Sequence, residues 1–277
     1  MASMNDIKAR MKSVTGTMQI TKAMELVASS KLRRAKLGAE SSRPYLAVSS
    51  HAVRSLLSLS EAADSPYLKR GVGPTLYLVI AGDRGLAGGY NANVFRLTAA
   101  LAQSTPEAVY LPIGKKAQEH YRHRGCTPWS EAYPEVAEIG VGACMTLGHD
   151  ICRAYAEGHL ESVVLVYTEF TSMMTQTPKS ATLLPLSMPD EPIPECEPLE
   201  DVEELMESVL PSYLGGLIHQ AVCESLAAES GARRTAMNAA SNNAKEMMDT
   251  LTLRYNQARQ AVITQEITEI VSGAEAL

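Results

Sequence analysis

The sequence predicts an α/β protein in which long helices at the two ends of the chain flank a small α/β domain with a largely parallel sheet. Residues 232–272 contain neither Gly nor Pro, apolar residues near the N-terminus recur at coiled-coil spacing, and strand and helix signals alternate through the middle. We therefore expect helices at residues 1–60 and 205–277, paired with each other, and an α/β domain at residues 74–190.

The N-terminal helix is predicted by apolar residues that alternate in steps of four and three, which is the seam period of a coiled coil. The seam comprises Ile7, Met11, Val14, Met18, Thr21, Glu25, Ala28, Leu32 and Ala35. Thr21 and Glu25 are its polar members. A second apolar line of Ile20, Met24 and Val27 runs beside it and indicates more than one neighbour. Pro44 is expected to end or kink the helix.

The middle of the chain alternates between short apolar runs and amphipathic stretches, which is typical of a mostly parallel sheet. Strands are expected at residues 75–82, 108–114, 162–170 and 180–186, and helices at residues 115–125 and 145–158. The segment 189–204 is rich in Pro and acidic residues, so we expect a linker there.

The C-terminal helix changes its apolar face near its end. Its 41-residue window would span about 60 Å, about twice the width of a compact domain. One narrow stripe comprises Met237, Ala240, Ala244, Met247, Leu251, Tyr255, Ala258 and Val262. The apolar residues after it, Ile263, Ile267, Ile270 and Val271, lie on the opposite side. The stripe is suited to pairing with the N-terminal helix. The end would contact something else, either another molecule or another part of the same domain.

Composition and charge exclude several classes of protein. The chain is 45% hydrophobic, has no apolar run of about 18 residues, and begins without a signal segment, so we expect a cytoplasmic protein. Its five cysteines are scattered, which favours buried thiols over a disulfide framework.

Charge is distributed unevenly along the chain. Residues 1–43 carry nine Lys or Arg and three Asp or Glu, whereas residues 44–231 carry 11 Lys or Arg and 23 Asp or Glu. This basic arm on an acidic body indicates either an acidic partner or a solvated face.

Few residues suggest a catalytic, metal or ligand-binding site. The Gly-rich segment 81–93 follows a strand but matches neither common phosphate-binding motif, so a structural turn is favoured over a nucleotide site. His120, His123 and Cys126 have a spacing that could hold a metal, although the segment resembles an ordinary exposed helix. The basic segment 31–36 lacks interleaved aromatic residues, so it favours an acidic protein surface over nucleic acid. We therefore expect no catalytic, metal or cofactor site.

Three segments resemble one family in the correct order. Residues 7–36, 82–95 and 255–277 are similar to the N-terminal helix, the central Gly-rich segment and the C-terminal signature of the gamma subunit of bacterial F-type ATP synthases. The resemblance implies a long antiparallel coiled coil of the two terminal helices and a small Rossmann-like α/β foot domain. It also implies a non-catalytic rotor shaft that couples ion-driven rotation of a c-ring to ATP synthesis on beta subunits.

The same resemblance implies partners and contact residues. The partners would be three alpha and three beta subunits, an epsilon subunit and the c-ring, without nucleic acid, at the cytoplasmic face of the cell membrane and without direct membrane insertion. The residues implied to contact the alpha/beta hexamer are Lys22, Met24, Val27, Lys31, Arg33, Arg34, Arg259, Gln260, Gln265, Glu266, Thr268 and Glu269. The foot loop near the levers on the beta subunits would comprise Gly85, Leu86, Gly88 and Gly89.

Two other classes of function stay open at this point. The Gly-rich segment could belong to a nucleotide-dependent enzyme with helical arms. Alternatively, the helices could form a static coiled-coil scaffold, including one on nucleic acid.

Overall fold

The computed structural model describes residues 4–59, 65–173, 175–187 and 201–275. The expected linker at residues 189–204 therefore lies almost entirely outside the described residues. Within the part of the chain that the structure describes, no helix combines the length and the apolar character needed to cross a membrane.

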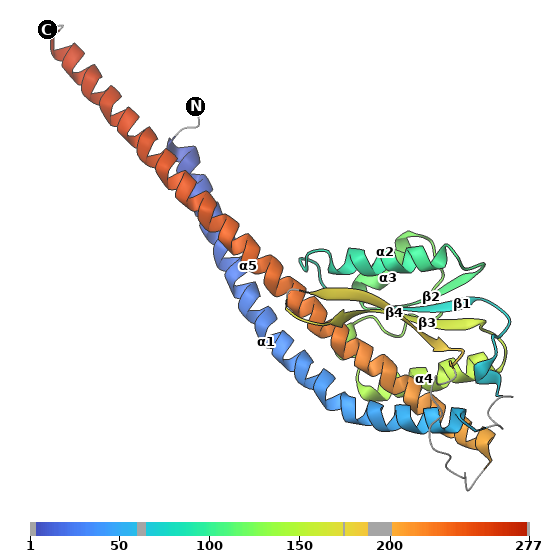
Figure 1. The fold of residues 1–277 in the computed structure, drawn as a ribbon. Coiled ribbons are helices and arrows are strands. Elements are labelled where there is room, and N and C mark those ends of the chain that lie inside the picture. The colour runs from blue at the N-terminus through green and yellow to red at the C-terminus, as the bar shows by residue number, and fades with distance from the viewer. Residues whose placement is uncertain (1–3, 60–64, 174, 188–200, 276–277) are drawn as a thin grey trace. The chain divides into compact units, whose positions relative to one another are not determined.

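The chain divides into two compact units that share two long helices. Unit 1 comprises Met1–Ala28 and Arg234–Leu277, and unit 2 comprises Ser29–Arg233. Helix α1 (Met4–Leu57) and helix α5 (Val202–Glu275) each contribute to both units (Figure 1).

Unit 2 contains a four-stranded mixed sheet. Its strands are β1 (Thr75–Ile80), β2 (Ala108–Ile113), β3 (Ser162–Phe170) and β4 (Gln176–Leu184). They are ordered β2-β1-β3-β4, with β1 parallel to both β2 and β3, and β4 antiparallel to β3. The largely parallel sheet is thus confirmed. The fourth strand, however, begins at Gln176 and ends before the predicted limit of residue 186.

Helices cover both faces of this sheet. Helices α2 (Tyr90–Ala102) and α3 (Lys115–His123) cover one face, and α4 (Val141–Ala156) with the first part of α5 covers the other (Figure 1). Every residue of β1 is buried, because alternate side chains enter the two layers. Leu76 and Leu78 pack with α4 and α5, whereas Tyr77 and Val79 pack with α2 and α3.

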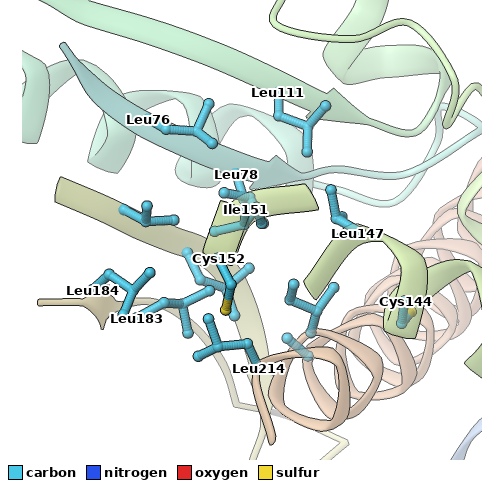
Figure 2. Packing of buried hydrophobic residues seen from close by; sticks show 14 of the residues in the cluster. Leu76, Leu78, Leu111, Cys144, Leu147, Ile151, Cys152, Leu183, Leu184 and Leu214 are labelled. Atoms are coloured by element: carbon cyan, nitrogen blue, oxygen red, sulfur yellow. The ribbon is translucent and has the colours of Figure 1, made fainter. Parts of the chain in front are cut away.

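The larger core lies between the sheet and the pair formed by α4 and α5. Figure 2 shows Leu147 and Ile151 of α4 and Leu214 of α5 directed into it. The two helices approach closely at two glycines. A Cβ atom on Gly148 would lie 2.8 Å from the backbone nitrogen of Gly215, and a Cβ on Gly215 would lie 2.8 Å from the Cα of Met145. Only glycine allows this separation without a shift of the backbone.

The part of α1 in unit 2 packs against the beginning of α5. Val53 and Leu57 form a small buried cluster with Val202 and Met206. Helix α1 does not end at Pro44, which lies inside it. Proline removes one backbone donor, but α1 contacts α5 at this point, where the Tyr45 hydroxyl donates to the carbonyl of Ser212 at 3.2 Å.

Unit 1 is an antiparallel pair of helices. The hydroxyl of Thr15 contacts the sulfur of Met248 at 3.7 Å, the hydroxyls of Thr21 and Ser241 are 2.7 Å apart, and Asn238 donates to Glu25 at 3.4 Å. The residue number therefore falls along α5 as it rises along α1. The predicted pairing of the two ends is confirmed.

The seam predicted for α1 is the face that is covered in the structure. Ile7, Thr21, Glu25, Ala28 and Leu32 are buried, and the other members of the seam are half-buried. The two polar members make hydrogen bonds across to α5, and such a pair favours one register of a coiled coil.

The stripe predicted for α5 is correct except at two positions. Met237, Ala244 and Leu251 are buried, and Ala240, Tyr255 and Ala258 are half-buried. Met247 is 44% exposed, and its neighbour Met248 takes the inward position instead. Val262 is 39% exposed. Ala244, Met248, Leu251, Tyr255 and Ala258 follow the alternating steps of four and three of a coiled-coil seam, and Met247 does not fit these steps.

Candidate functional site

The end of α5 presents an uncovered apolar face. Ile263, Ile267, Ile270 and Val271 are exposed, by 45%, 57%, 71% and 51%. Helix α1 begins at Met4, and the antiparallel register places its first turns opposite residues that precede these four. No described residue of unit 1 covers them.

The polar residues implied to contact a partner occupy the same end of α5. Arg259, Gln260, Glu266 and Thr268 are exposed. The side chain of Gln265 donates to Glu269 at 2.9 Å, and the Thr268 hydroxyl donates to the carbonyl of Thr264. These side chains are therefore presented by one continuous helix, with their only described hydrogen bonds made within that helix.

The first three implied contact residues on α1, which lie in unit 1, have different environments. Lys22 pairs with Glu25 at 3.0 Å while its side chain stays 60% exposed. Hydrogen bonding to Lys22 lowers the pKa of Glu25. Met24 is half-buried, and Val27 is 56% exposed beside Ile20 and Leu26. The second apolar line is thus mostly open in this chain.

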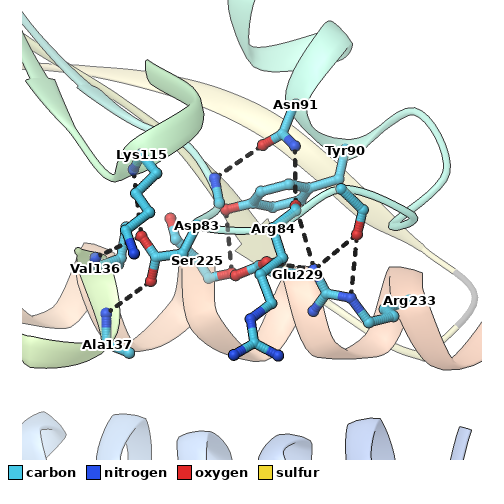
Figure 3. Close-up of polar contacts among 12 residues, drawn as sticks. Asp83, Arg84, Tyr90, Asn91, Lys115, Val136, Ala137, Ser225, Glu229 and Arg233 are labelled. Carbon is cyan, nitrogen blue, oxygen red and sulfur yellow. Dashed lines mark hydrogen bonds and ion pairs between the residues drawn. The ribbon is translucent and has the colours of Figure 1, made fainter. Parts of the chain in front are cut away.

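The Gly-rich loop between β1 and α2 is held by its own polar residues (Figure 3). The Asp83 carboxylate accepts from the backbone N–H groups of Lys115 at 3.4 Å, Val136 at 2.9 Å and Ala137 at 3.2 Å. Asn91 accepts from the N–H of Gly82 at 2.8 Å. Asp83 thus occupies the N-terminus of α3, where a phosphate could otherwise bind. This geometry favours a structural turn over a nucleotide site at that helix.

A buried ion pair fastens the loop to α5. Arg233 pairs with Glu229 at 2.6 Å, and their side chains are only 11% and 8% exposed. The Arg233 guanidinium also donates to the carbonyls of Gly85 at 3.1 Å and Arg84 at 3.3 Å. A Cβ on Gly82 would lie 2.8 Å from the Glu229 carboxylate, which explains the glycine at that position.

Apolar contacts fasten the other side of the loop and leave its tip exposed. Ala87 and Tyr90 are buried against Ala228, and the Tyr90 hydroxyl donates to the carbonyl of Ser225 at 3.2 Å. Leu86 is 65% exposed and has a positive φ of 61°, which is uncommon for a residue with a side chain. An exposed apolar side chain is therefore held on strained backbone at the tip of the foot loop.

The structure brings part of the basic segment to this loop. Lys31, Arg33 and Arg34 are all exposed on α1. Lys31 and Arg34 line a cavity together with Asp83 and Arg84 of the loop, whereas Arg33 does not. Residues i and i+3 share a helix face, which is why these two cations point the same way.

The other candidate side chains are engaged in packing. The His120 ring stacks on Phe95 with ring centroids 3.9 Å apart, and His123 contacts the carbonyl oxygen of Glu119. No group of three potential metal ligands occurs among the residues that the structure describes. Cys144, Cys152 and Cys223 are buried free thiols, and Cys126 is a half-buried one.

The Glu229–Arg233 pair was not predicted from the sequence. The available signal was an acidic and a basic residue four positions apart in an Ala-rich stretch that contains few other charges. Burial of both residues could not be inferred, because it depends on the approach of the loop from β1.

Comparison with known proteins gives consistent matches along the whole chain. The family model described as ATP synthase matches residues 3–277. The ATP synthase gamma chain of Ruminococcus albus is 43% identical over 284 residues, covering 99% of this chain and 98% of that protein. The sodium ion specific ATP synthase gamma chain of Acetobacterium woodii is 36% identical over 304 residues, covering 99% of both chains.

Solved structures share the fold. A chain of the Euglena gracilis mitochondrial ATP synthase, from a structure of OSCP, F1 and c-ring, aligns with a TM-score of 0.67 and 17% identity, over 99% of this chain and 94% of that one. A chain of the Tetrahymena thermophila mitochondrial ATP synthase, from its central stalk and c-ring, aligns with a TM-score of 0.60 and 20% identity, over 80% and 99%.

Proposed function

Because this chain belongs to the family of ATP synthase gamma chains, we propose that it is the central rotor shaft of an F-type ATP synthase. It would couple rotation of a c-ring, driven by ion flow across the membrane, to ATP synthesis on beta subunits. The chain itself would carry no catalytic site.

The end of α5 is the observation that carries this proposal. A shaft needs a stiff helical end that its own partner helix does not cover. The four apolar side chains at residues 263–271 are exposed beyond the paired region. Exposed apolar side chains gathered on one helix face indicate a protein-binding surface. We infer that they seat in a collar formed by alpha and beta subunits.

Coupling would rest on contact free energy and not on chemistry in this chain. A rotor biases the state of a catalytic subunit only if it makes different contacts with each state. The end of α5 meets this need because polar residues such as Gln265 and Glu269 and apolar residues such as Ile263 and Ile267 occupy different sides of one helix. Three equivalent sites around this asymmetric helix would face three different surfaces.

The remaining partners follow from the same role. We propose contacts of Lys31, Arg33 and Arg34 and of the exposed foot-loop tip with acidic levers on the beta subunits. The foot domain would bind an epsilon subunit and the c-ring. The complex would lie at the cytoplasmic face of a bacterial cell membrane, without insertion of this chain into the bilayer.

Replacing Arg259 and Gln260 with Ala is expected to lower ATP turnover of the assembled complex severalfold. The variant removes two exposed polar groups that we place against a beta loop, so the free energy of unfolding of the isolated chain should change by less than about 0.5 kcal/mol. Turnover is measured on the purified complex. The double variant Arg96→Ala/Gln103→Ala, which removes the same side-chain types from the exposed surface of the foot, is the matched control. Equal turnover in the two variants would contradict the contact role.

Replacing Arg33 and Arg34 with Glu is expected to reduce the ions pumped per ATP hydrolysed, with smaller effects on assembly. Charge reversal would repel an acidic lever instead of attracting it, and like-charge contacts in an interface are unfavourable. The ratio is measured in inverted membrane vesicles. Arg122→Glu/Arg124→Glu makes the same change in net charge at the end of α3. If pumping stays normal in both variants, the basic segment is a solvated face.

A further inference from the structure

A cavity of about 400 Å³ opens within unit 2 between α1, the Gly-rich loop and α5. Lys31 and Arg34 line it from α1, Arg84 from the loop, Lys115 from the start of α3, and Arg233 from α5. Its volume lies within the range of about 300–1,000 Å³ that is usual for small-molecule sites.

The positive charge of this cavity is not neutralised by the residues that the structure describes. Its three carboxylates are already engaged: Glu229 pairs with Arg233, Glu135 pairs with Lys115, and Asp83 accepts three backbone N–H groups. Throughout the described chain, the side chains of Lys31, Arg34 and Arg84 form no hydrogen bond or ion pair. Figure 3 shows the Arg84 guanidinium directed away from the hydrogen-bonded network.

This local charge contrasts with the rest of the molecule. The chain has a formal net charge of −6, so long-range electrostatics disfavour the approach of a small anion to most of its surface. A cavity with three unpaired cations on two walls is a place where an anion can still be held. Guanidinium groups suit phosphate especially, because they bind two of its oxygens at once.

We propose that this cavity binds an oligophosphate, meaning the phosphate chain of a nucleoside diphosphate or inorganic pyrophosphate. A chain of phosphates can contact Lys31 and Arg34 on one wall and Arg84 on the other at the same time. A single phosphate would contact fewer of these cations and would bind more weakly. Leu226, Ala35 and Ala137 give the cavity an apolar lining that can accept a nucleoside. The site differs from a nucleotide loop, since Asp83 occupies the N-terminus of α3.

The consequence for the rotor would be regulatory. Lys31 and Arg34 are two of the three cations that we place against the levers of the beta subunits, and a bound oligophosphate would neutralise them. Arg33 does not line the cavity and would stay available. The ligand would therefore weaken the contact of the basic segment with acidic protein surfaces.

Isothermal titration of the full-length chain with pyrophosphate, ADP and inorganic phosphate, without added divalent cation, tests the proposal. We expect one site for pyrophosphate or ADP, at least tenfold weaker binding of inorganic phosphate, and affinity that falls with salt. Tighter binding of ADP than of pyrophosphate would assign the ligand as a nucleotide, and equal binding would assign it as the phosphate chain alone. Binding also raises the melting temperature of the chain.

The decisive comparison uses two matched variants. Arg34→Ala/Arg84→Ala removes two cations from the cavity and should weaken pyrophosphate binding at least tenfold. Arg33→Ala/Arg96→Ala removes two exposed cations outside the cavity and should change it less than twofold. Circular dichroism verifies that both variants are folded. Absence of binding to the unaltered chain, or equal weakening by the two variants, would overturn the site, whereas the rotor proposal is tested separately by turnover and ion pumping.

Discussion

Replacing Arg233 with Met is expected to lower the free energy of unfolding of this chain by about 3–5 kcal/mol. The substitution leaves the Glu229 carboxylate, whose side chain is 8% exposed, without its cation. It also removes the donors to the Gly85 and Arg84 carbonyls. Urea denaturation measures the loss. Faster hydrogen exchange of the loop amides would locate the loss of stability in residues 82–90.

Two further variants separate the buried charge from the lost packing. Arg233→Met/Glu229→Gln removes both charges, so it should recover part of the stability that the single change loses. Arg96→Met removes a cation from the exposed surface of α2 and should change stability by about 0.5 kcal/mol or less. A loss below about 1 kcal/mol in Arg233→Met would mean that the ion pair does not hold the loop.

Replacing Gly148 with Val is expected to cost at least about 3 kcal/mol of stability, at the upper end of overpacking effects. Even a single Cβ at this position would lie 2.8 Å from the Gly215 nitrogen and closer still to the Pro211 carbonyl oxygen. These are backbone atoms of α5, so relief requires the two helices to move apart. That movement would open the core around Leu147 and Leu214.

The matched control lies in the same helix. Gly142 has no atom within 4 Å of a built Cβ, so Gly142→Ala should leave stability unchanged or raise it by up to about 1 kcal/mol. Urea midpoints of the two variants are compared directly. If Gly148→Val resembled Gly142→Ala, α4 and α5 would not be in the close contact described here.

Much of the fold was predictable because its signals are local. Residues 76–80 form an unbroken apolar run, so β1 follows from its burial on two faces. The seam from Ile7 to Ala35 follows from its period alone. The first half of β4 was missed since its residues, Gln176 to Lys179, are polar or Pro and carry no apolar signal. Its strand character comes from hydrogen bonding to β3 at the edge of the sheet.

The candidate site was likewise predictable only in part. The change of apolar face at the end of α5 was foreseen, because it is a property of consecutive residues, whereas the exposure of this end was left open. The cavity was not foreseen. Lys31, Arg84 and Arg233 are distant in sequence, and no local pattern indicates that they surround one space.

By itself, the sequence determined the two long terminal helices, α3, α4 and most of the sheet, most of the positions that the long helices cover, and the apolar residues that the end of α5 offers to a neighbour. Tertiary structure alone decided that Arg233 and Glu229 are buried, that Asp83 occupies the start of α3, and that three cations around one cavity have no partner among the described residues. The physical reason is that periodicity reports burial within one element. Desolvation and charge pairing depend instead on which elements meet, and that is set by the packing of the whole unit.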